Sequence, residues 1–313
     1  MDIFHSYTDL PVEARGAVVA LGCFDGVHKG HQAIFAAARQ LAAARNRPMG
    51  MVTFHPHPRR VLDAEAPPFR ILNNAARLNV CAMYGVEMAW VLPFDLPFAG
   101  LSPEVFIEKV IVEGLQASAV VVGENFRFGY QRQGTPDLLQ RLGAVLGFAV
   151  VVVPSERGAD GTVYSSTAVR QAIREGRIRD ANLLLGRPWE VSGTVESGDK
   201  RGAQLGFPTA NIVWGDYVVP RYGVYAVQVS CRRITWRPAV ANIGVRPTIG
   251  DGLQPRLEVH VFDYRGELYG EKLNVRVVDF LRPEQRFPSL DDLKAQIARD
   301  CDAARALLEP LAS

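Results

Sequence analysis

Two histidines stand three residues apart in the stretch LGCFDGVHKGHQAI, residues 21–34. His28 and His31 follow a short apolar run and share the stretch with three glycines. Glycine lets a backbone bend and come close to a ligand. Imidazole N–H groups beside a phosphate can stabilise the charge that develops on phosphorus during transfer. The stretch therefore predicts chemistry on a phosphate.

The elements around the histidines are expected to place them at the ligand edge of a sheet. Residues 16–21 read as a buried strand and residues 30–47 as a helix. Ligands of open α/β sheets gather where strands end, and a helix N-terminus favours a phosphate there. Neither GxxxxGK[ST] nor GxGxxG is present in the stretch. For the histidines alone, a structural or capping role and a metal pair remain alternatives, although no third ligand with convincing spacing stands nearby.

The two halves of the chain differ in hydrophobic pattern. In the first half, continuous apolar runs alternate with helical stretches, which is typical of a parallel sheet covered on both faces. After about residue 184 the strands alternate with period two between Gly, Pro and Asp turns, which predicts an antiparallel barrel or sandwich. A helix capped by Ser289 closes the chain. We expect an α/β domain over residues 1–185 and an all-β domain over residues 186–313.

Composition excludes several classes of partner. The 35 Lys and Arg nearly balance the 33 Asp and Glu, whereas nucleic-acid binding usually calls for a strongly basic face. No apolar run is long enough to span a bilayer, and the first residues lack the basic and apolar regions of a signal peptide. The four cysteines form no CxxC pair. We expect a cytoplasmic protein without nucleic-acid or membrane partners, and the sequence leaves the oligomeric state open.

The HxGH signature resembles that of the nucleotidyltransferase superfamily, which transfers a nucleoside monophosphate from a triphosphate. Residues 53–62, 93–106, 122–129 and 165–173 follow it in the order and spacing of the prokaryotic riboflavin kinase/FAD synthetase family. The resemblance implies a Rossmann-like domain that adenylylates FMN to FAD with release of pyrophosphate, with the two histidines catalytic. It implies flavin binding by His57, Asn125 and Arg127. It implies ATP binding by Gly22, Phe24, Asp25, His28, Gly30, His31, Ser166, Thr167 and Arg170.

Several of these side chains also have a simpler reading. His57 could equally pack within its proline-rich loop. Ser166 and Thr167 could be plain helix caps, which would explain the hydroxyls but not Arg170 on the first turn. Of the two phenylalanines in residues 122–129, at least one is expected in the core.

The second half carries its own motif, LGFPTANI, residues 205–212. Pro208 fixes the chain before Thr209 and Asn211, whose side-chain oxygens face the same side of an extended segment. Such hard oxygen ligands suit Mg²⁺ held alongside ATP phosphates. A turn with local Thr and Asn hydrogen bonds is the alternative.

A carboxylate follows on the predicted strand over residues 256–264. Leu257 and Val259 fall on one face and Glu258 and His260 on the other. A carboxylate on the ligand side of a barrel could accept the proton of a hydroxyl that attacks phosphorus. Taken alone, a Glu on the polar face of a strand is usually only solvated.

The second half resembles the riboflavin kinase module of the same family along nearly its full length, through residues 205–212, 241–248, 257–270 and 280–300. The resemblance implies that this module phosphorylates riboflavin to FMN with ATP and Mg²⁺, and that Glu258 is the base. It also implies a barrel with a closing C-terminal helix. Thr209 and Asn211 would hold the metal. ATP binding is implied for Gly206, Pro208, Thr209 and Asn211.

Three positions depart from the family pattern: Ala203, Ala168 and Thr135 stand where the family often has a charged residue. We expect weaker or altered ATP binding rather than lost activity, because the histidines, the PTAN motif and Glu258 remain. The alternatives are a nucleotidyltransferase acting on another phosphate and a flavin-binding protein without catalysis.

Overall fold

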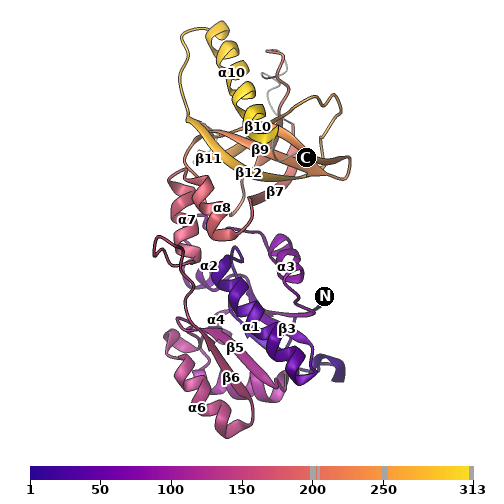
Figure 1. Ribbon diagram of the computed structural model, residues 1–313, viewed down its shortest axis with the longest axis vertical. Coiled ribbons are helices and arrows are strands. Elements are labelled where there is room, and N and C mark those ends of the chain that lie inside the picture. The colour runs from indigo at the N-terminus through magenta and orange to yellow at the C-terminus, as the bar shows by residue number, and fades with distance from the viewer. Residues whose placement is uncertain (198–201, 203–204, 248–252, 310–313) are drawn as a thin grey trace. The chain divides into compact units, whose positions relative to one another are not determined.

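The structure is a computed structural model that describes residues 1–197, 202, 205–247 and 253–309. The position of Ala203 lies outside the described residues. The chain forms two compact units (Figure 1). The first comprises Met1–Pro67 and Asn74–Ser165, and the second comprises Pro68–Asn73 with the described part of Ser166–Ser313. Within the described residues, no helix is both long and apolar enough to cross a bilayer.

The first unit is built on a six-stranded parallel sheet in the order β1-β4-β3-β2-β5-β6. In β2 the side chains of both faces are buried, because Val18 and Ala20 point to one face and Val19 and Leu21 to the other. This burial explains the continuous apolar runs and confirms the predicted doubly covered sheet. The strands are β1 (Asp2–Phe4), β2 (Val18–Leu21), β3 (Met49–His55), β4 (Met88–Pro93), β5 (Ala119–Gly123) and β6 (Ala149–Val153).

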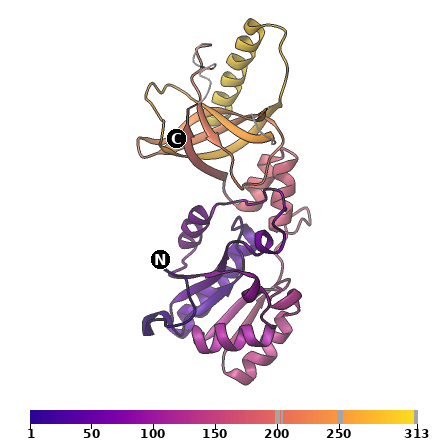
Figure 2. The ribbon, with the colours of Figure 1, turned by 180° about the vertical axis from the view of Figure 1, so that it is seen from behind.

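Helices cover both faces of this sheet. The helix α1 (Lys29–Arg45) crosses the face seen in Figure 1 and buries Phe35 and Ala38. The opposite face, seen in Figure 2, carries α5 (Pro103–Phe106), its π-helical continuation η2 (Ile107–Gly114) and α6 (Pro136–Leu146). The other helices are η1 (Val12–Ala14), α2 (Pro58–Leu62), α3 (Asn74–Met83), α4 (Leu96–Ala99) and η3 (Tyr130–Arg132).

Side-chain caps begin both helical segments on the opposite face. The Ser102 hydroxyl accepts a hydrogen bond from the Val105 N–H at 3.2 Å. The Thr135 hydroxyl accepts one from the Leu138 N–H, also at 3.2 Å. Thr135, one of the departures from the family pattern, therefore serves as the N-cap of α6.

The second unit is a closed barrel of six antiparallel strands in the order β10-β11-β8-β7-β12-β9. Period-two alternation decides which side chains fill it: Leu257 and Val259 are buried, whereas Glu258 and His260 are half-buried. The strands are β7 (Trp189–Glu196), β8 (Ala210–Val213), β9 (Gly223–Cys231), β10 (Ile234–Pro247), β11 (Leu253–Val261) and β12 (Lys272–Pro283).

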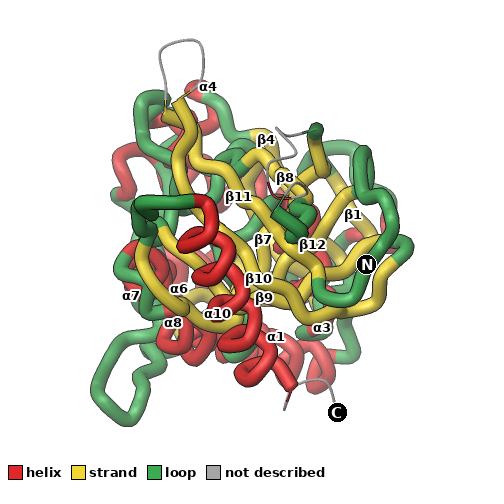
Figure 3. Tube along the Cα trace, turned by 90° about the horizontal axis from the view of Figure 1, so that it is seen from above, coloured by secondary structure: helices red, strands yellow, loops and turns green. Residues whose placement is uncertain are grey.

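Among the described residues, the second unit also contains the helices α7 (Ser166–Arg174), α8 (Ile178–Leu185) and α10 (Leu290–Leu308). The last packs across β9 and β10, as Figure 3 shows. The Ser289 hydroxyl accepts a hydrogen bond from the Asp292 N–H at 3.1 Å, so the predicted cap is confirmed. The predicted combination of an α/β domain with an antiparallel barrel and a closing helix is thus correct.

A short piece of the first half, Pro68–Asn73, forms part of the core of the second unit. Phe69, Ile71 and Leu72 are fully buried there. The Trp189 indole N–H donates to the Ile71 carbonyl at 3.0 Å. This placement could not be predicted from the sequence, because the segment is remote in the chain from the rest of the unit that it joins.

We expect Asn73→Ala to lower the free energy of unfolding of the second unit by about 1–3 kcal/mol. The Asn73 amide donates to the Tyr217 hydroxyl at 2.7 Å and to the Ser192 hydroxyl at 2.8 Å, and the variant loses both bonds. Hydrogen exchange of peptides from β7 and β9 measures the change, with peptides from the first unit as internal control. Asn79→Ala, on the exposed face of α3, is the matched variant. Unchanged exchange in β7 would contradict the prediction.

Candidate functional site

A cavity of about 240 Å³ opens at the carboxyl ends of β2, β5 and β6 in the first unit. It lies where the first strand passes into α1, the position expected for a ligand of an open α/β sheet. His28 and His31 line the cavity from the side of α1, and Asn125 and Ser155 line it from the strand ends. The structure therefore brings the two predicted histidines to one cavity and places Asn125 on its opposite wall.

The two imidazoles lie against each other. His28 is the N-cap residue of α1, and its ring stacks on that of His31 with centroids 3.7 Å apart and an interplanar angle of 26°. The edge-on ring of Phe24 contacts His31 at a centroid distance of 5.2 Å. The pair thus presents ring N–H groups at the start of a helix, where backbone N–H groups also favour an anion.

A glycine is required where α1 begins. A Cβ on Gly30 would lie only 2.8 Å from the Tyr164 carbonyl oxygen. Gly22, Phe24 and Gly30, three of the residues predicted to bind ATP, all line the cavity, and their binding of ATP stays a prediction. Asp25 is buried, at 2% exposure, and does not belong to the lining.

The strand-end wall contains a polar cluster around Ser155. The Asn125 amide donates to the Ser155 hydroxyl at 2.9 Å. A hydrogen bond from the Ser155 hydroxyl, together with one from its backbone N–H, lowers the pKa of Glu124. Glu124 is therefore an ionised hydrogen-bond acceptor at the cavity mouth at neutral pH. No local sequence pattern marks Ser155 or Glu124 as members of the site.

Two of the predicted flavin-binding residues have local roles instead of lining the cavity. The His57 ring is the N-cap of α2, where its Nδ1 accepts a hydrogen bond from the Arg59 N–H at 3.1 Å. The exposed guanidinium of Arg127 donates to the Phe126 carbonyl at 2.7 Å. Their binding of flavin stays a prediction.

The predicted phosphate-binding hydroxyls belong to the second unit. Ser166 and Thr167 are the first residues of α7, followed on the next turn by Arg170. The Arg170 guanidinium donates to the Phe69 carbonyl at 2.8 Å and so fastens the Pro68–Asn73 segment. Ala168, the second departure from the family pattern, lies on the same turn of α7. The role of these residues toward ATP stays a prediction.

A second cavity, of about 310 Å³, lies between α10 and the outer face of β9, β10 and β11. Its lining is mixed: the barrel contributes the polar Glu258 and Asn242, and α10 contributes the apolar Leu293 and Ile297. Such a mixed wall suits a planar ring system that carries a polar chain.

Three polar side chains form a row across neighbouring strands of this unit. Glu258 on β11 stands directly opposite Asn211 on β8 and Asn242 on β10. Directly opposite residues of an antiparallel pair project from the same face. Within the described part of the chain, the buried Asn211 Oδ1 has no hydrogen-bond partner. Such a buried amide oxygen has the chemistry of a ligand for a hard cation.

A third cavity, of about 210 Å³, lies in the same unit. Pro208 and Thr209 belong to its lining, and Thr209 also lines the second cavity. The Pro208 carbonyl lies 2.9 Å from His260 Nδ1, which anchors the segment that carries Thr209. Gly206 has a φ of +89°, the left-handed backbone that glycine adopts without strain. The PTAN motif therefore separates two neighbouring cavities.

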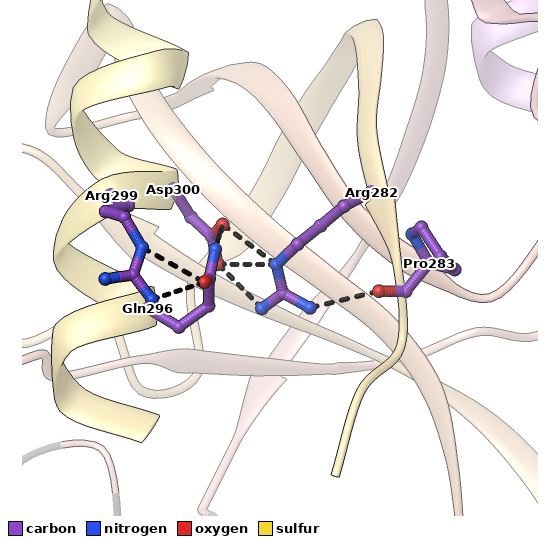
Figure 4. A network of polar contacts seen from close by, with 5 residues as sticks. All are labelled: Arg282, Pro283, Gln296, Arg299 and Asp300. Atoms are coloured by element: carbon purple, nitrogen blue, oxygen red, sulfur yellow. Dashed lines mark hydrogen bonds and ion pairs between the residues drawn. The ribbon is translucent and has the colours of Figure 1, made fainter. Parts of the chain in front are cut away.

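An ion-pair network fixes α10 to the barrel (Figure 4). Arg282, at the end of β12, makes a bidentate contact with Asp300, with Nε–Oδ1 and Nη2–Oδ2 distances of 2.9 and 2.7 Å. Gln296 donates to the same carboxylate at 2.9 Å and accepts from Arg299. Arg282 and Asp300 also line the second cavity, so the network holds its helical wall in place.

Comparison with known proteins places both halves of the chain. The FAD synthetase family matches residues 10–168, and the riboflavin kinase family matches residues 185–308. A Pseudomonas fluorescens protein named bifunctional riboflavin kinase/FMN adenylyltransferase is 42% identical over 313 residues, covering 100% of this chain and 99% of the relative. The Escherichia coli K12 protein of the same name is 40% identical over 302 residues, covering 96% of this chain and 95% of the relative.

A solved structure supports the same architecture. The crystal structure of a protein described as a macrolide-efflux protein from Streptococcus pneumoniae is 34% identical, with a TM-score of 0.87, and covers 97% of this chain and 98% of that chain. The family matches, in this order along one chain, and the full-length relatives agree with the two kinds of unit in the structure. The chain belongs to the bifunctional riboflavin kinase/FMN adenylyltransferase family.

Proposed function

We propose that this chain makes FAD from riboflavin in two steps, one for each domain predicted from the sequence. The domain over residues 186–313 phosphorylates riboflavin to FMN, and the domain over residues 1–185 adenylylates FMN to FAD. The observation that carries the assignment is the row of Asn211 and Glu258 beside Thr209, the residue shared by two neighbouring cavities. Two cavities that share Thr209 suit a reaction in which a phosphoryl group passes from one bound molecule to another.

In the phosphorylation, riboflavin occupies the larger cavity beneath α10 and ATP occupies the cavity beyond Thr209. Glu258 accepts the proton of the ribityl 5′-hydroxyl as its oxygen attacks the γ-phosphorus. The bond from the γ-phosphorus to the bridging oxygen breaks, and ADP leaves. No covalent intermediate with the protein is needed, because positioning and charge stabilisation suffice.

The donor set of the PTAN motif fits Mg²⁺. The buried amide oxygen of Asn211, without a partner in the described residues, and the hydroxyl of Thr209 are hard oxygen ligands. We assign both to the cation. When bound, Mg²⁺ neutralises part of the phosphate charge that repels the attacking oxygen.

In the adenylylation, a phosphate oxygen of FMN attacks the α-phosphorus of ATP, and pyrophosphate leaves. His28 and His31 donate hydrogen bonds to the oxygens of the α-phosphate, whose charge rises in the transition state. Asn125 and Arg127 face the flavin or its phosphate, and Ser166, Thr167 and Arg170 meet the departing phosphates. The stacked imidazoles on the cavity wall support the first of these assignments.

We further infer a cytoplasmic enzyme with riboflavin, FMN and ATP as its small-molecule partners. The absence of CxxC pairs and the balanced charge of the sequence support this inference. Residues 1–185 and 186–313 are the proposed functional domains, consistent with the limits of the two family matches. Incubation of the purified chain with riboflavin, ATP and Mg²⁺, followed by chromatography, tests the whole scheme. A transferase for another phosphate would produce no FMN, and a flavin sensor would release neither ADP nor pyrophosphate.

Asn211→Ala is expected to raise the Mg²⁺ concentration for half-maximal FMN formation by at least ~10-fold. The variant removes the buried amide oxygen that we assign to the cation. The measurement is a Mg²⁺ titration of riboflavin phosphorylation, with conversion of supplied FMN to FAD followed in parallel.

Asn274→Ala, on β12 of the same barrel, is the matched control, since its amide donates to the Ser230 hydroxyl and does not belong to the row of Asn211, Glu258 and Asn242. An unchanged Mg²⁺ requirement in Asn211→Ala would remove Asn211 from the metal site. An equal shift in both activities would mean that the effect does not arise in the second unit.

A further inference from the structure

The loop that carries the histidines has an unusual backbone. Between β2 and α1, Phe24 and Val27 adopt φ values of 51° and 45°, and Gly26 one of 86°. Non-glycine residues seldom take up this left-handed conformation, and they keep it only where the surroundings hold them. Phe24 and Val27 are both fully buried. The loop therefore depends on fixed contacts for its shape.

The carbonyl of Cys23 is the point at which the rest of the unit holds this loop. It accepts a hydrogen bond from Nη1 of Arg77 at 2.5 Å and another from the Thr53 hydroxyl at 3.2 Å. Both donors have no exposed surface. Hydrogen bonds from a charged donor are about twice as strong as neutral ones, and burial strengthens them further.

The Arg77 side chain connects the segments that follow two neighbouring strands, β2 and β3. It projects from α3, and its Nη2 donates to the Phe54 carbonyl at 3.4 Å and to the Asn74 side-chain oxygen at 2.6 Å. Phe54 lies near the end of β3, the strand next to β2. The planar guanidinium can reach the two carbonyls at once, which the single ammonium of a lysine cannot do.

The contact passes from Cys23 to the imidazoles through Phe24. The Phe24 ring touches His31, with centroids 5.2 Å apart, and packs on Phe35 of α1 at 4.7 Å. A Cβ on Gly22 would lie 3.1 Å from the same ring, so the loop backbone closes over it. Movement of the Cys23 carbonyl would therefore displace Phe24, and with it the stacked pair of histidines.

We propose that Arg77 is a positioning residue for the adenylylation of FMN. It does not line the cavity; it holds the Cys23 carbonyl so that Phe24 keeps His31 and His28 directed at the α-phosphate. The inference rests on the proposed role of the two histidines. Nothing in the local sequence marks Arg77 for this role, because an arginine on a helix ordinarily faces solvent.

The test compares Arg77→Met and Arg77→Lys with Leu78→Ala, a buried neighbour on α3 that makes no hydrogen bond to the loop. For Arg77→Met, kcat of FMN adenylylation should fall about 10²-fold, as expected for a small misplacement of catalytic groups, with a much smaller change in KM for FMN. Arg77→Lys should recover only part of the rate. Riboflavin phosphorylation by the same chain should be unchanged, and Leu78→Ala should lower the unfolding midpoint without this loss of kcat.

A double-mutant cycle separates positioning from simple stability. In a His31→Ala background, Arg77→Met should lower kcat of FMN adenylylation by a further factor of less than about three, because the imidazole that Arg77 positions is absent. The proposal would be overturned if the losses of kcat in Arg77→Met and His31→Ala multiplied in the double variant. It would also be overturned if Leu78→Ala lost as much kcat as Arg77→Met. If Arg77→Met does not fold, Thr53→Val removes the other hydrogen bond to Cys23 and must then reduce kcat. Full FAD formation by His31→Ala alone would instead refute the proposed function.

Discussion

Replacing His31 by alanine is expected to abolish nearly all FAD formation while FMN accumulates. The imidazole supplies a hydrogen-bond donor where charge develops on the α-phosphate, and loss of one such donor costs about 10²–10³-fold in kcat. The variant also removes the stacking partner of His28, whose ring lies 3.7 Å away between centroids. The measurement is chromatographic separation of riboflavin, FMN and FAD from one reaction mixture.

The same chain provides the internal control for this experiment. Because the histidines belong to the first unit, riboflavin phosphorylation should continue at the original rate in His31→Ala. His5→Ala is the matched variant, since His5 is exposed in the same unit and lies outside the cavity. Equal loss of FMN and FAD would contradict the assignment of one reaction to each unit.

Much of the fold could be predicted from the periodicity of the sequence. The apolar run over Val18–Leu21 is buried on both faces, and the alternation over Leu257–Val261 separates the barrel core from its polar face. These patterns depend on the local chain alone, so one sequence suffices to read them. Helix caps such as Ser289 are equally local and equally readable.

The candidate site could be predicted from the sequence only in part, because which residues of neighbouring strands lie together depends on the pairing register of the strands. Alternation placed Glu258 on a polar face and Asn211 on the side of Thr209, but no local rule places Asn211 opposite Glu258. The family resemblance supplied that connection. The position of Asn242, the third member of the row, could not be predicted for the same reason. The sequence of one strand does not show which residues lie opposite it on the neighbouring strands.

The residues that fix the elements lining the cavities could not be predicted from the sequence. Arg77 looks like an ordinary helix cation, yet it is fully buried against a loop carbonyl. Arg282 and Asp300 are 18 residues apart in the chain and meet only because α10 folds back on β12. The capping role of His57, in contrast, could have been predicted from the sequence. Pro58 directly after it is typical of a first helical position.

Glu258→Gln should lower kcat of riboflavin phosphorylation by about 10²–10⁴-fold, the usual contribution of a general base. Glutamine keeps the size of the side chain and its place opposite Asn211 and Asn242, but it cannot accept the proton of the attacking hydroxyl. Conversion of supplied FMN to FAD should be unaffected. The measurement is the initial rate of FMN formation at saturating ATP and Mg²⁺.

The informative comparison is Glu284→Gln, which removes another carboxylate from the same cavity. Glu284 is exposed and follows β12, a strand that pairs with neither β8 nor β11, so it is not part of the row of Asn211, Glu258 and Asn242. If Glu258 acts as the base, the loss in Glu258→Gln must exceed that in Glu284→Gln by at least ~10-fold. Similar losses in both variants would mean that the cavity needs negative charge in general, and the proton would then have to leave the hydroxyl by another route.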